Sequence, residues 1–429
     1  MERNAIEFLK EWKEKKRRKP LIIEGARQVG KTWLAKEFAR QCYKSIAYVN
    51  FEDQKHLRGL FAENYNMERI LLAIETETGQ KCIPGETLIF LDEIQEANGG
   101  LTSLKYFNEN APEQHIIVAG SLLGIELHKK ESFPVGKVEF LRLHPLNFEE
   151  FLLAVGENKL YDLLQQKDWT LINVFNGKFI DRLRQYYFIG GMPEVVSAFA
   201  DGASFDEVRE IQRNILESYN NDFSKHAPNE IVPRIRQLWS SIPAQLSREN
   251  RKFTYGLVKE GARAREYEMA MMWLKDCGLV QSVNCVKAPK YPLKAFEDMS
   301  AFKLFIVDVG LLAAMNDVDA RILLKGNDIF SEYKGALTEQ YAMQQLMIDH
   351  ELFYWSKPNS QAEIDFLMQD EDGVVPIEVK AEENLRAKSL KLFSETYKPK
   401  KVIRTSMSPY RKEEWMTNIP LYAIGSSSI

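Results

Sequence analysis

A glycine-rich loop at residues 25–32 restricts the fold of this chain more than any other feature. It follows a short apolar run at residues 21–24 and precedes a helical pattern at residues 33–40. Its pattern is G-x-x-x-x-G-K-T, formed by Gly25, Ala26, Arg27, Gln28, Val29, Gly30, Lys31 and Thr32. Glycines let a main chain curl around phosphate oxygens, and loop amides together with a helix N-terminus supply partial positive charge. A glycine-rich turn with a chance lysine is the less specific interpretation.

The loop predicts an ATP site with a magnesium ion. Lys31 is placed to reach the β- and γ-phosphates, and the hydroxyl of Thr32 is placed to ligate Mg²⁺. Trp33 opens the helical stretch that follows the loop. We therefore expect residues 25–33 to bind the nucleotide, with ATP and Mg²⁺ as cofactors.

A strand that ends in two acids makes this prediction more specific. The run TLIFL at residues 87–91 leads into Asp92 and Glu93. Continuously apolar strands are buried on both faces in parallel sheets, and such sheets bind ligands at their carboxyl ends. We expect Asp92 to hold the Mg²⁺ ion and Glu93 to orient and deprotonate the attacking water, which disfavours a metabolic kinase. A solvated acidic strand end is the alternative.

Three further apolar runs predict the remaining strands of a sheet. They lie at residues 46–51, 115–121 and 138–143, and helical segments separate the strands. This order predicts an α/β fold with a doubly wound parallel sheet. The first domain is expected to span residues 1–145.

Two more runs accompany these motifs: GKVEFLRLHPLNFEEF at residues 136–151 and GGMPE at residues 190–194. Together the motifs resemble those of bacterial and archaeal AAA+ ATPases fused to a C-terminal PD-(D/E)xK restriction-endonuclease-like domain. The resemblance covers nearly the whole chain. It implies a P-loop ATPase core and a small helical lid, and it places Ser121 at the sensor-1 position that reports on the γ-phosphate. It also implies a homo-oligomer, because AAA+ relatives often need an arginine from a neighbouring subunit.

Two positions qualify the resemblance. Lys137 stands where the family usually shows arginine, which puts a charge-stabilising role there in doubt. Arg142 is an alternative arginine-finger candidate, although an exposed arginine at a strand end is the simpler interpretation. The sequence shows no clear sensor-2 arginine.

The middle of the chain predicts two helical parts. Residues 146–226 show helical apolar spacing and correspond to the lid. Residues 227–322 predict a winged-helix module, with a helix-turn-helix at residues 255–277 and strands at residues 279–286 and 303–309 as its wing. Six bases and two acids at residues 247–265 favour contact with DNA or RNA. Docking of a protein partner remains the alternative.

The last part of the chain, residues 323–429, carries a second set of candidate residues. Its order of helices and strands, α-β-β-β-α-β, resembles the PD-(D/E)xK nuclease core. Glu378 and Lys380 are two residues apart and share one strand face, and Asp365 lies on the neighbouring strand. We expect Asp365, Glu378 and the helical Glu339 to hold Mg²⁺ or Mn²⁺ for phosphodiester hydrolysis, because hard carboxylate oxygens suit these ions.

Lys380 would orient the attacking water or neutralise the phosphate in this nuclease-like site. Seven bases and one acid at residues 386–404 favour a phosphate backbone beside it. The alternative is a retained nuclease-like fold whose carboxylates are idle and paired to lysines. In that case the protein is a signalling or docking ATPase that binds a protein partner.

Charge and hydropathy limit the remaining classes. The formal net charge is only −4, so any contact with nucleic acid must be local. No run approaches the roughly 18 apolar residues that span a membrane, and the first residues lack the apolar core of a signal peptide. The sequence therefore predicts a cytoplasmic, ATP-hydrolysing protein that acts on or near nucleic acid, without membrane contact.

Overall fold

The computed structural model describes residues 1–120, 134–248, 251–325, 331–357, 360–381 and 387–425. The chain divides into two compact units. Residues 2–144 with 276–278 form the first, which we call the P-loop unit. Residues 145–275 and 279–429 with Met1 form the second, the C-terminal unit.

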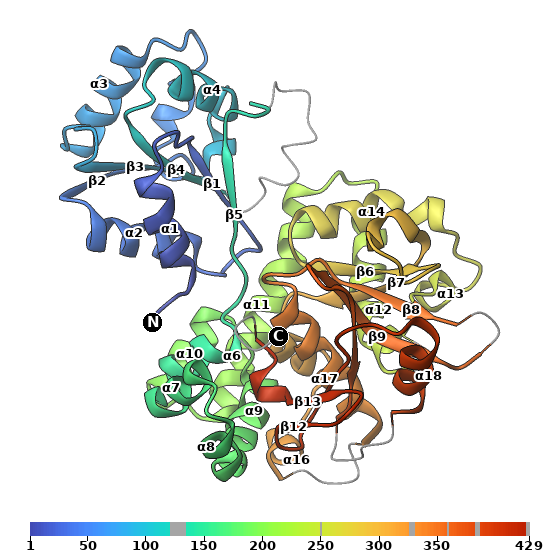
Figure 1. Cartoon of the computed structure of the whole chain (residues 1–429). Helices are drawn as coiled ribbons and strands as arrows, with labels where there is room; N and C mark the ends of the chain where they lie inside the picture. The colour runs from blue at the N-terminus through green and yellow to red at the C-terminus, as the bar shows by residue number, and fades with distance from the viewer. Residues whose placement is uncertain (121–133, 249–250, 326–330, 358–359, 382–386, 426–429) are drawn as a thin grey trace. The chain divides into compact units, whose positions relative to one another are not determined.

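The P-loop unit is a parallel sheet of five strands in the order β2-β3-β4-β1-β5. Helices α1 and α2 lie on one face of this sheet, and α3 and α4 lie on the other (Figure 1). The elements are α1 (Ala5–Glu14), β1 (Leu21–Glu24), α2 (Lys31–Cys42), β2 (Ser45–Asn50), α3 (Met67–Thr78), β3 (Thr87–Asp92), α4 (Gly100–Asn110), β4 (His115–Ala119) and β5 (Glu139–Arg142).

The burial of each strand agrees with its place in the sheet. Every residue of β3 and β4 is buried, as expected of inner strands covered on both faces, whereas β5 at the edge alternates between half-buried and exposed residues. The core between the sheet and α3–α4 is built from side chains such as Ile89, Leu91 and Ile116. The predicted doubly wound parallel sheet is thereby confirmed, with each strand within about two residues of its expected range.

The C-terminal unit begins with a set of helices, as the apolar spacing from residue 146 predicts. They are α6 (Phe148–Ala154), α7 (Asn158–Gln166), α8 (Trp169–Val174), α9 (Asn176–Ile189), α10 (Pro193–Ala200), α11 (Phe205–His226), α12 (Val232–Leu246), α13 (Tyr255–Val258) and α14 (Ala264–Asp276). Helices α9 and α11 pack against α15, within the same unit. The role of residues 146–226 as a lid stays a prediction.

The rest of the unit is a mixed sheet with its helices. The elements are β6 (Val280–Val286), β7 (Glu297–Ile306), α15 (Val309–Met315), α16 (Ala320–Lys325), α17 (Ser331–Leu346), β8 (Phe353–Ser356), β9 (Glu363–Asp370), β10 (Gly373–Val379), α18 (Lys388–Tyr397), β11 (Ile403–Ser406), β12 (Arg411–Lys412) and β13 (Thr417–Pro420). The order from α17 to β11 is the predicted α-β-β-β-α-β; β12 and β13 are additional.

One sheet joins two regions that the sequence separates. The strand order is β12-β13-β11-β10-β9-β8-β6-β7, so the β6–β7 hairpin continues the C-terminal sheet. The hairpin was expected as the wing of a winged-helix module, but β6 pairs in parallel with β8 through Asn284 and Cys285. Both strands are partly apolar, and the neighbouring strand supplies the hydrogen bonds that a separate wing would lack.

The glycines of the GGMPE run have a structural explanation. Gly190 has a φ of +75°, and a Cβ there would lie 2.1 Å from the Asp308 carboxylate. A Cβ on Gly191 would lie 2.0 Å from the carbonyl oxygen of Leu146, and the Gly191 amide donates to Asp308 Oδ2 at 2.6 Å. Close approach of three segments therefore requires glycine at both positions.

Helix α17 is buried with a polar face. Gln340 exchanges two hydrogen bonds with the main chain of Ile306, at 3.1 and 2.7 Å, and Gln344 accepts from the Val309 amide at 3.0 Å. Buried polar groups need such partners, so these glutamines fix the helix against the end of β7. Glu339 lies in the same helix.

Among the residues that the structure describes, no helix is both long and apolar enough to cross a bilayer.

Candidate functional site

The glycine-rich loop connects β1 to α2 and contains three residues with positive φ. Gly25 has a φ of +139°, and a Cβ there would lie 2.2 Å from the carbonyl oxygen of Leu143. Gly30 is the left-handed N-cap of α2, and Gln28 also has a positive φ of 65°. The backbone conformation therefore requires glycine at both ends of the loop, and at Gly25 the close approach of Leu143, the residue after β5, requires it as well.

Lys31 is buried inside this loop. Its Nζ donates to the carbonyl oxygens of Gly25 and Ala26, each at 2.8 Å. Burial lowers the pKa of Lys31 to about 8, and the charges of Glu93 and Asp92 oppose this shift only in part. The loop thus holds an ammonium that loses hydration without gaining a full counter-charge.

The predicted magnesium ligands meet at the carboxyl edge of the sheet, where Thr32 comes from the first turn of α2 and Asp92 from the end of β3. Thr32 Oγ1 donates to Asp92 Oδ2 at 2.8 Å. Burial raises the pKa of Asp92 above its usual value, and the hydrogen bond from Thr32 opposes this shift only in part. A hydroxyl and a carboxylate side by side form a donor set that suits Mg²⁺. These residues therefore fit the metal that accompanies a nucleotide.

Glu93 follows directly, and its backbone is strained. Its φ of 49° and ψ of 46° are left-handed, which is uncommon for a residue other than glycine. Gln95 Nε2 donates to Glu93 Oε2 at 2.5 Å. Strain of this kind often marks a functional position, and the sharp turn directs the chain away after the predicted base.

Two residues of this site were not predicted. The Tyr48 hydroxyl at the end of β2 donates to Asp92 Oδ2 at 3.2 Å, and the Tyr48 ring stacks on Phe90 with centroids 5.3 Å apart. The rule that parallel strands end at one edge could have found Tyr48. Arg3 is buried and donates to the Val29 carbonyl at 3.1 Å and to the His144 carbonyl at 2.6 Å. No signal in the sequence pointed to Arg3.

Other predicted positions of the P-loop unit are less central. Ser121 lies outside the described residues. Trp33 is 42% exposed at the start of α2. Lys137 pairs with Glu109 at 2.9 Å. Arg142 is exposed, and its guanidinium lies 4.0 Å from the Glu24 carboxylate, its register partner on β1.

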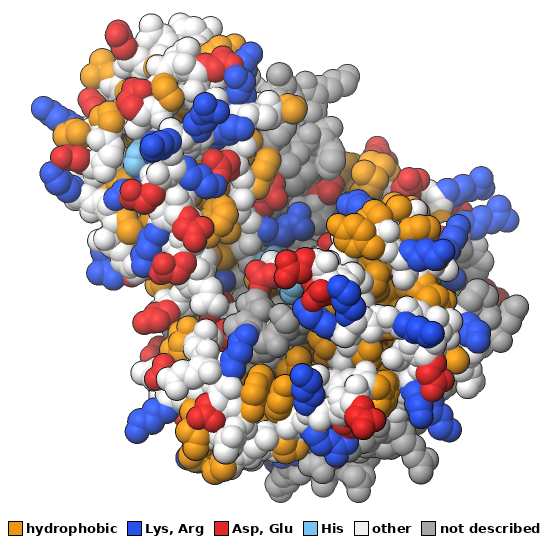
Figure 2. All heavy atoms as spheres, in the orientation of Figure 1, with side chains coloured by type: hydrophobic (Ala, Val, Ile, Leu, Met, Phe, Trp, Pro, Cys, Tyr) orange, Lys and Arg blue, Asp and Glu red, His pale blue; other side chains and the backbone are white. Residues whose placement is uncertain are grey.

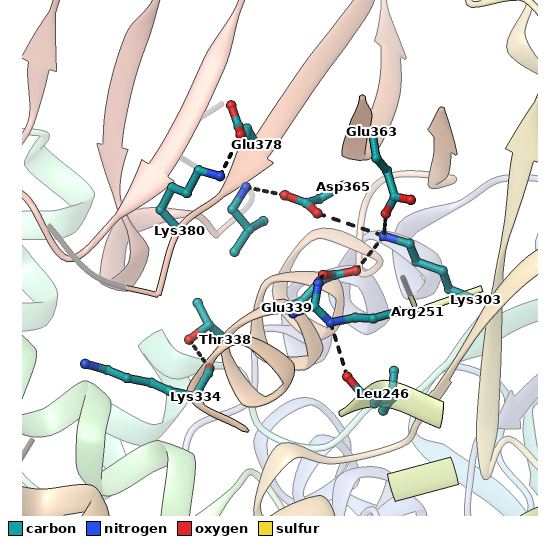
Figure 3. A network of polar contacts seen from close by, with 11 residues as sticks. Leu246, Arg251, Lys303, Lys334, Thr338, Glu339, Glu363, Asp365, Glu378 and Lys380 are labelled. Atoms are coloured by element: carbon teal, nitrogen blue, oxygen red, sulfur yellow. Dashed lines mark hydrogen bonds and ion pairs between the residues drawn. The ribbon is translucent and has the colours of Figure 1, made fainter. Parts of the chain in front are cut away.

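The C-terminal unit gathers carboxylates around one ammonium (Figure 3). Lys303 Nζ of β7 lies 2.8 Å from Glu339 Oε1, 2.6 Å from Glu363 Oε1 and 3.9 Å from Asp365 Oδ1. Arg251 forms an ion pair with the other oxygen of Glu339. We call these five residues the Lys303 cluster. The sequence predicts a role for Glu339 and Asp365, whereas no motif pointed to Lys303 or Arg251.

Glu378 and Lys380 form a separate pair. Their charged groups are 2.7 Å apart, and Asp365 accepts a hydrogen bond from the Val379 amide of the same strand, at 2.8 Å. The second oxygen of Glu378 is buried without a hydrogen-bond partner among the described residues. In the described part of the chain, no group of three or more His, Cys, Asp or Glu side chains is arranged to hold a metal ion.

Ionisation within the Lys303 cluster follows from burial and pairing. Burial lowers the pKa of Lys303, but Glu339, Glu363 and Asp365 outweigh it, so the net pKa is raised. Burial raises the pKa of Glu339, but Arg251 and Lys303 lower it below its usual value. For Asp365, burial and the charge of Glu339 raise the pKa to about 7.

In the two regions expected to contact phosphate, several Lys and Arg side chains form contacts within the protein. Arg251 belongs to the Lys303 cluster, and Arg404 is buried. Lys400 pairs with Asp372 at 3.1 Å, and Lys401 pairs with Asp370 at 2.7 Å. In contrast, basic and apolar side chains gather at the surface over α14 (Figure 2).

Comparison with known proteins assigns the N-terminal region most clearly. Residues 17–152 match the model of an AAA domain. Residues 180–321 and 334–424 match two domains whose function is unknown. No curated protein matches the sequence.

Solved structures add only distant likenesses. A Walker-type ATPase of Pyrococcus abyssi is 14% identical, with a TM-score of 0.44 over 73% of this chain and 94% of that one. The ORC1 protein of Aeropyrum pernix, solved in complex with DNA, is 14% identical, with a TM-score of 0.27 over 73% of this chain and 90% of that one. The assignment of the P-loop unit therefore depends on its own sequence and strands. Its sequence is similar to that of an AAA domain, and its parallel sheet of five strands has the P-loop ATPase fold.

Proposed function

We propose that the P-loop unit binds ATP with Mg²⁺ and hydrolyses it. One observation carries this proposal: the hydroxyl of Thr32 and the carboxylate of Asp92 meet at 2.8 Å, at the carboxyl edge of the sheet. A nucleotide in the loop between β1 and α2 would present its β- and γ-phosphates to these groups.

Each residue of the site has a distinct task in this proposal. Lys31 exchanges its carbonyl partners for phosphate oxygens, which restores the counter-charge that burial removed. Thr32 and Asp92 hold the magnesium ion, which neutralises charge on the phosphates when bound. Glu93 follows Asp92 directly and accepts the proton of the attacking water.

Turnover of purified protein with Glu93→Gln tests the proposal. We expect ATP binding to persist and hydrolysis to fall roughly 100-fold or more, because the amide does not accept the proton. Glu96→Gln is the matched control, since Glu96 lies three residues away and pairs with Arg58 at 2.7 Å. Turnover of Glu93→Gln at the rate of this control would reject Glu93 as the base.

A second part of the proposal concerns nucleic acid. Lys259, Arg263 and Arg265 are exposed around the turn that leads into α14. Exposed Lys and Arg side chains at the start of a helix can contact phosphate groups, and the predicted helix-turn-helix occupies this segment. We infer that this surface binds the backbone of DNA or RNA.

Fluorescence anisotropy with labelled DNA and RNA tests this surface. Replacing Lys259, Arg263 and Arg265 by Glu should weaken binding and reduce the slope of log affinity against log salt by roughly one per lost phosphate contact. The control replaces Lys10, Arg40 and Lys44, which are exposed on the P-loop unit. Equal binding by both triple variants would favour the alternative, a docking ATPase that recognises a protein.

The remaining predictions have less support. Homo-oligomers, an arginine finger at Arg142, sensor 1 at Ser121 and a lid at residues 146–226 are proposals carried by the resemblance. For nuclease activity at Asp365, Glu378 and Lys380, the contacts of Lys303 favour the alternative of idle carboxylates.

A further inference from the structure

The Lys303 cluster joins four separate segments of the C-terminal unit. Arg251 precedes the short helix α13, Lys303 belongs to β7, Glu339 to α17, and Glu363 with Asp365 to β9. All five side chains point toward one another in Figure 3. We propose that Lys303 is the built-in cation of this cluster and takes the place of a divalent metal ion, so that the C-terminal unit does not cleave nucleic acid there.

The position of Lys303 is the first argument. Its side chain is completely buried, and its Nζ contacts one carboxylate from α17 and two from β9. A divalent ion shared by Glu339 and Asp365 would need the space between their oxygens, and the ammonium lies there. Buried lysines are rare unless they are paired, so this placement requires the carboxylates.

Charge balance is the second argument. Two cations, Lys303 and Arg251, face two carboxylates that hydrogen-bond or pair with them directly, Glu339 and Glu363. The third carboxylate, Asp365, lies farther from the ammonium, at 3.9 Å, and accepts a hydrogen bond from the Val379 amide at 2.8 Å. The cluster therefore carries no more than one net negative charge, and a divalent ion would leave at least one positive charge uncompensated at low dielectric.

The donor set is the third argument. Both oxygens of Glu339 are in use, one with Lys303 and one with Arg251. Asp365 Oδ2 accepts a hydrogen bond from Val379. Glu378 pairs with Lys380 rather than with this group, and its second oxygen is buried without a hydrogen-bond partner among the described residues. The residues present therefore do not fit the two-carboxylate metal site of a nuclease.

The inference is independent of ATP hydrolysis. In this proposal, the carboxylates form ion pairs that hold β7, β9, α17 and the segment of Arg251 together. Loss of turnover in the P-loop unit would leave it intact, because no group of the Lys303 cluster belongs to that unit.

Binding of Mn²⁺ to the full chain without nucleotide tests the inference. The signal of free Mn²⁺ in electron paramagnetic resonance gives the number of ions bound. We expect the wild-type protein, Asp365→Asn and Glu378→Gln to bind equally, because the cluster holds no ion. Mn²⁺ that the wild type binds and either variant loses would overturn the proposal.

Removal of the lysine gives the complementary test. In Lys303→Met, the carboxylates lose their cation and should accept Mn²⁺ instead, so that millimolar Mn²⁺ raises the Tm by roughly 3 °C or more. Adding Asp365→Asn should abolish this rise. Lys44→Met is the matched control, because Lys44 pairs with Glu86 at the surface at 2.7 Å.

A Lys303→Met protein that folds and ignores Mn²⁺ would also overturn the proposal. If Lys303→Met does not fold, Lys303→Arg keeps the charge, and this variant should fold and bind no more Mn²⁺ than the wild type. The comparison of wild type with Asp365→Asn and Glu378→Gln then decides by itself.

Discussion

Two buried lysines, one in each unit, show opposite electrostatic states. Lys31 donates to two main-chain carbonyls, and its pKa is lowered to about 8. Lys303 lies among three carboxylates, and its pKa is raised above its ordinary value. Both side chains are removed from water, so burial alone does not explain the difference.

The contrast separates a site that awaits a ligand from one that is complete. Carbonyl dipoles only partly replace the hydration of an ammonium, which therefore gains when phosphate arrives. Ionised carboxylates replace it fully and leave nothing for a further ion to gain. A lysine with a lowered pKa in a glycine-rich loop indicates binding, whereas a lysine with a raised pKa among acids indicates structure.

The charge of Lys31 should determine nucleotide affinity. In Lys31→Met, the Kd for ATP should rise roughly 10- to 100-fold, because a charge-assisted contact to phosphate is lost. Stability should not fall, since the variant removes a buried charge that has only carbonyl partners. Calorimetric titration measures the Kd and urea unfolding measures the stability. A large loss of stability would show that the loop carbonyls stabilise the buried ammonium of Lys31.

Removing a carboxylate from the Lys303 cluster should affect stability instead. Glu339→Gln should lower the free energy of unfolding by about 3–5 kcal/mol, because Lys303 and Arg251 both lose a buried partner. Glu157→Gln, which removes the partner of the half-exposed Arg182, should cost about 1 kcal/mol or less. Urea denaturation distinguishes them, and equal losses would show that the cluster is not a buried ionic core.

The pH dependence of ATP binding should follow Lys31. As pH rises through about 8, the ammonium loses its proton, so the Kd for ATP should increase by up to tenfold per pH unit. Lys31→Arg stays charged and should bind with a flat profile. A flat profile in the wild type would show that the pKa is not lowered.

Over the same range, Lys303 should contribute no change in stability. Its folded pKa is raised, so its contribution is complete below the unfolded pKa of about 10.4 and is lost only as pH rises through the folded value. Loss of this contribution between pH 7 and 9, seen as a difference between wild type and Lys303→Met, would contradict it.

The smallest effect concerns Tyr48. Tyr48→Phe removes the hydrogen bond of 3.2 Å to Asp92 but keeps the ring on Phe90. The Mg²⁺ concentration for half-maximal ATPase rate should rise roughly 2- to 10-fold, since one hydrogen bond that positions the carboxylate is lost. An unchanged magnesium dependence would show that the Tyr48 hydroxyl does not position Asp92.

Much of the P-loop unit could be predicted because its signals are local. The loop at residues 25–32 and the acids after β3 are fixed by short stretches of sequence, and parallel strands bring their ends to one edge. Tyr48 and Arg3 could not be chosen in this way, because each acts through a contact with another segment. Strands were expected at residues 279–286 and 303–309. The first is confirmed as β6, but the second begins and ends earlier, at residues 297–306, and the pairing of β6 with β8 was not predicted.

The sequence by itself determined the phosphate loop, the acids that face it, the order of strands in the P-loop unit and the order of elements from α17 to β11. Glycine spacing, apolar runs and strand period determine these features because they act over a few residues. Only the tertiary structure decided which cation faces the C-terminal carboxylates. Lys303 lies 36 residues from Glu339 in the chain, and Arg251 lies 88 residues from it. A motif of carboxylates and lysine does not encode which distant ammonium folding places among them, and that placement separates a metal site from an internal ion pair.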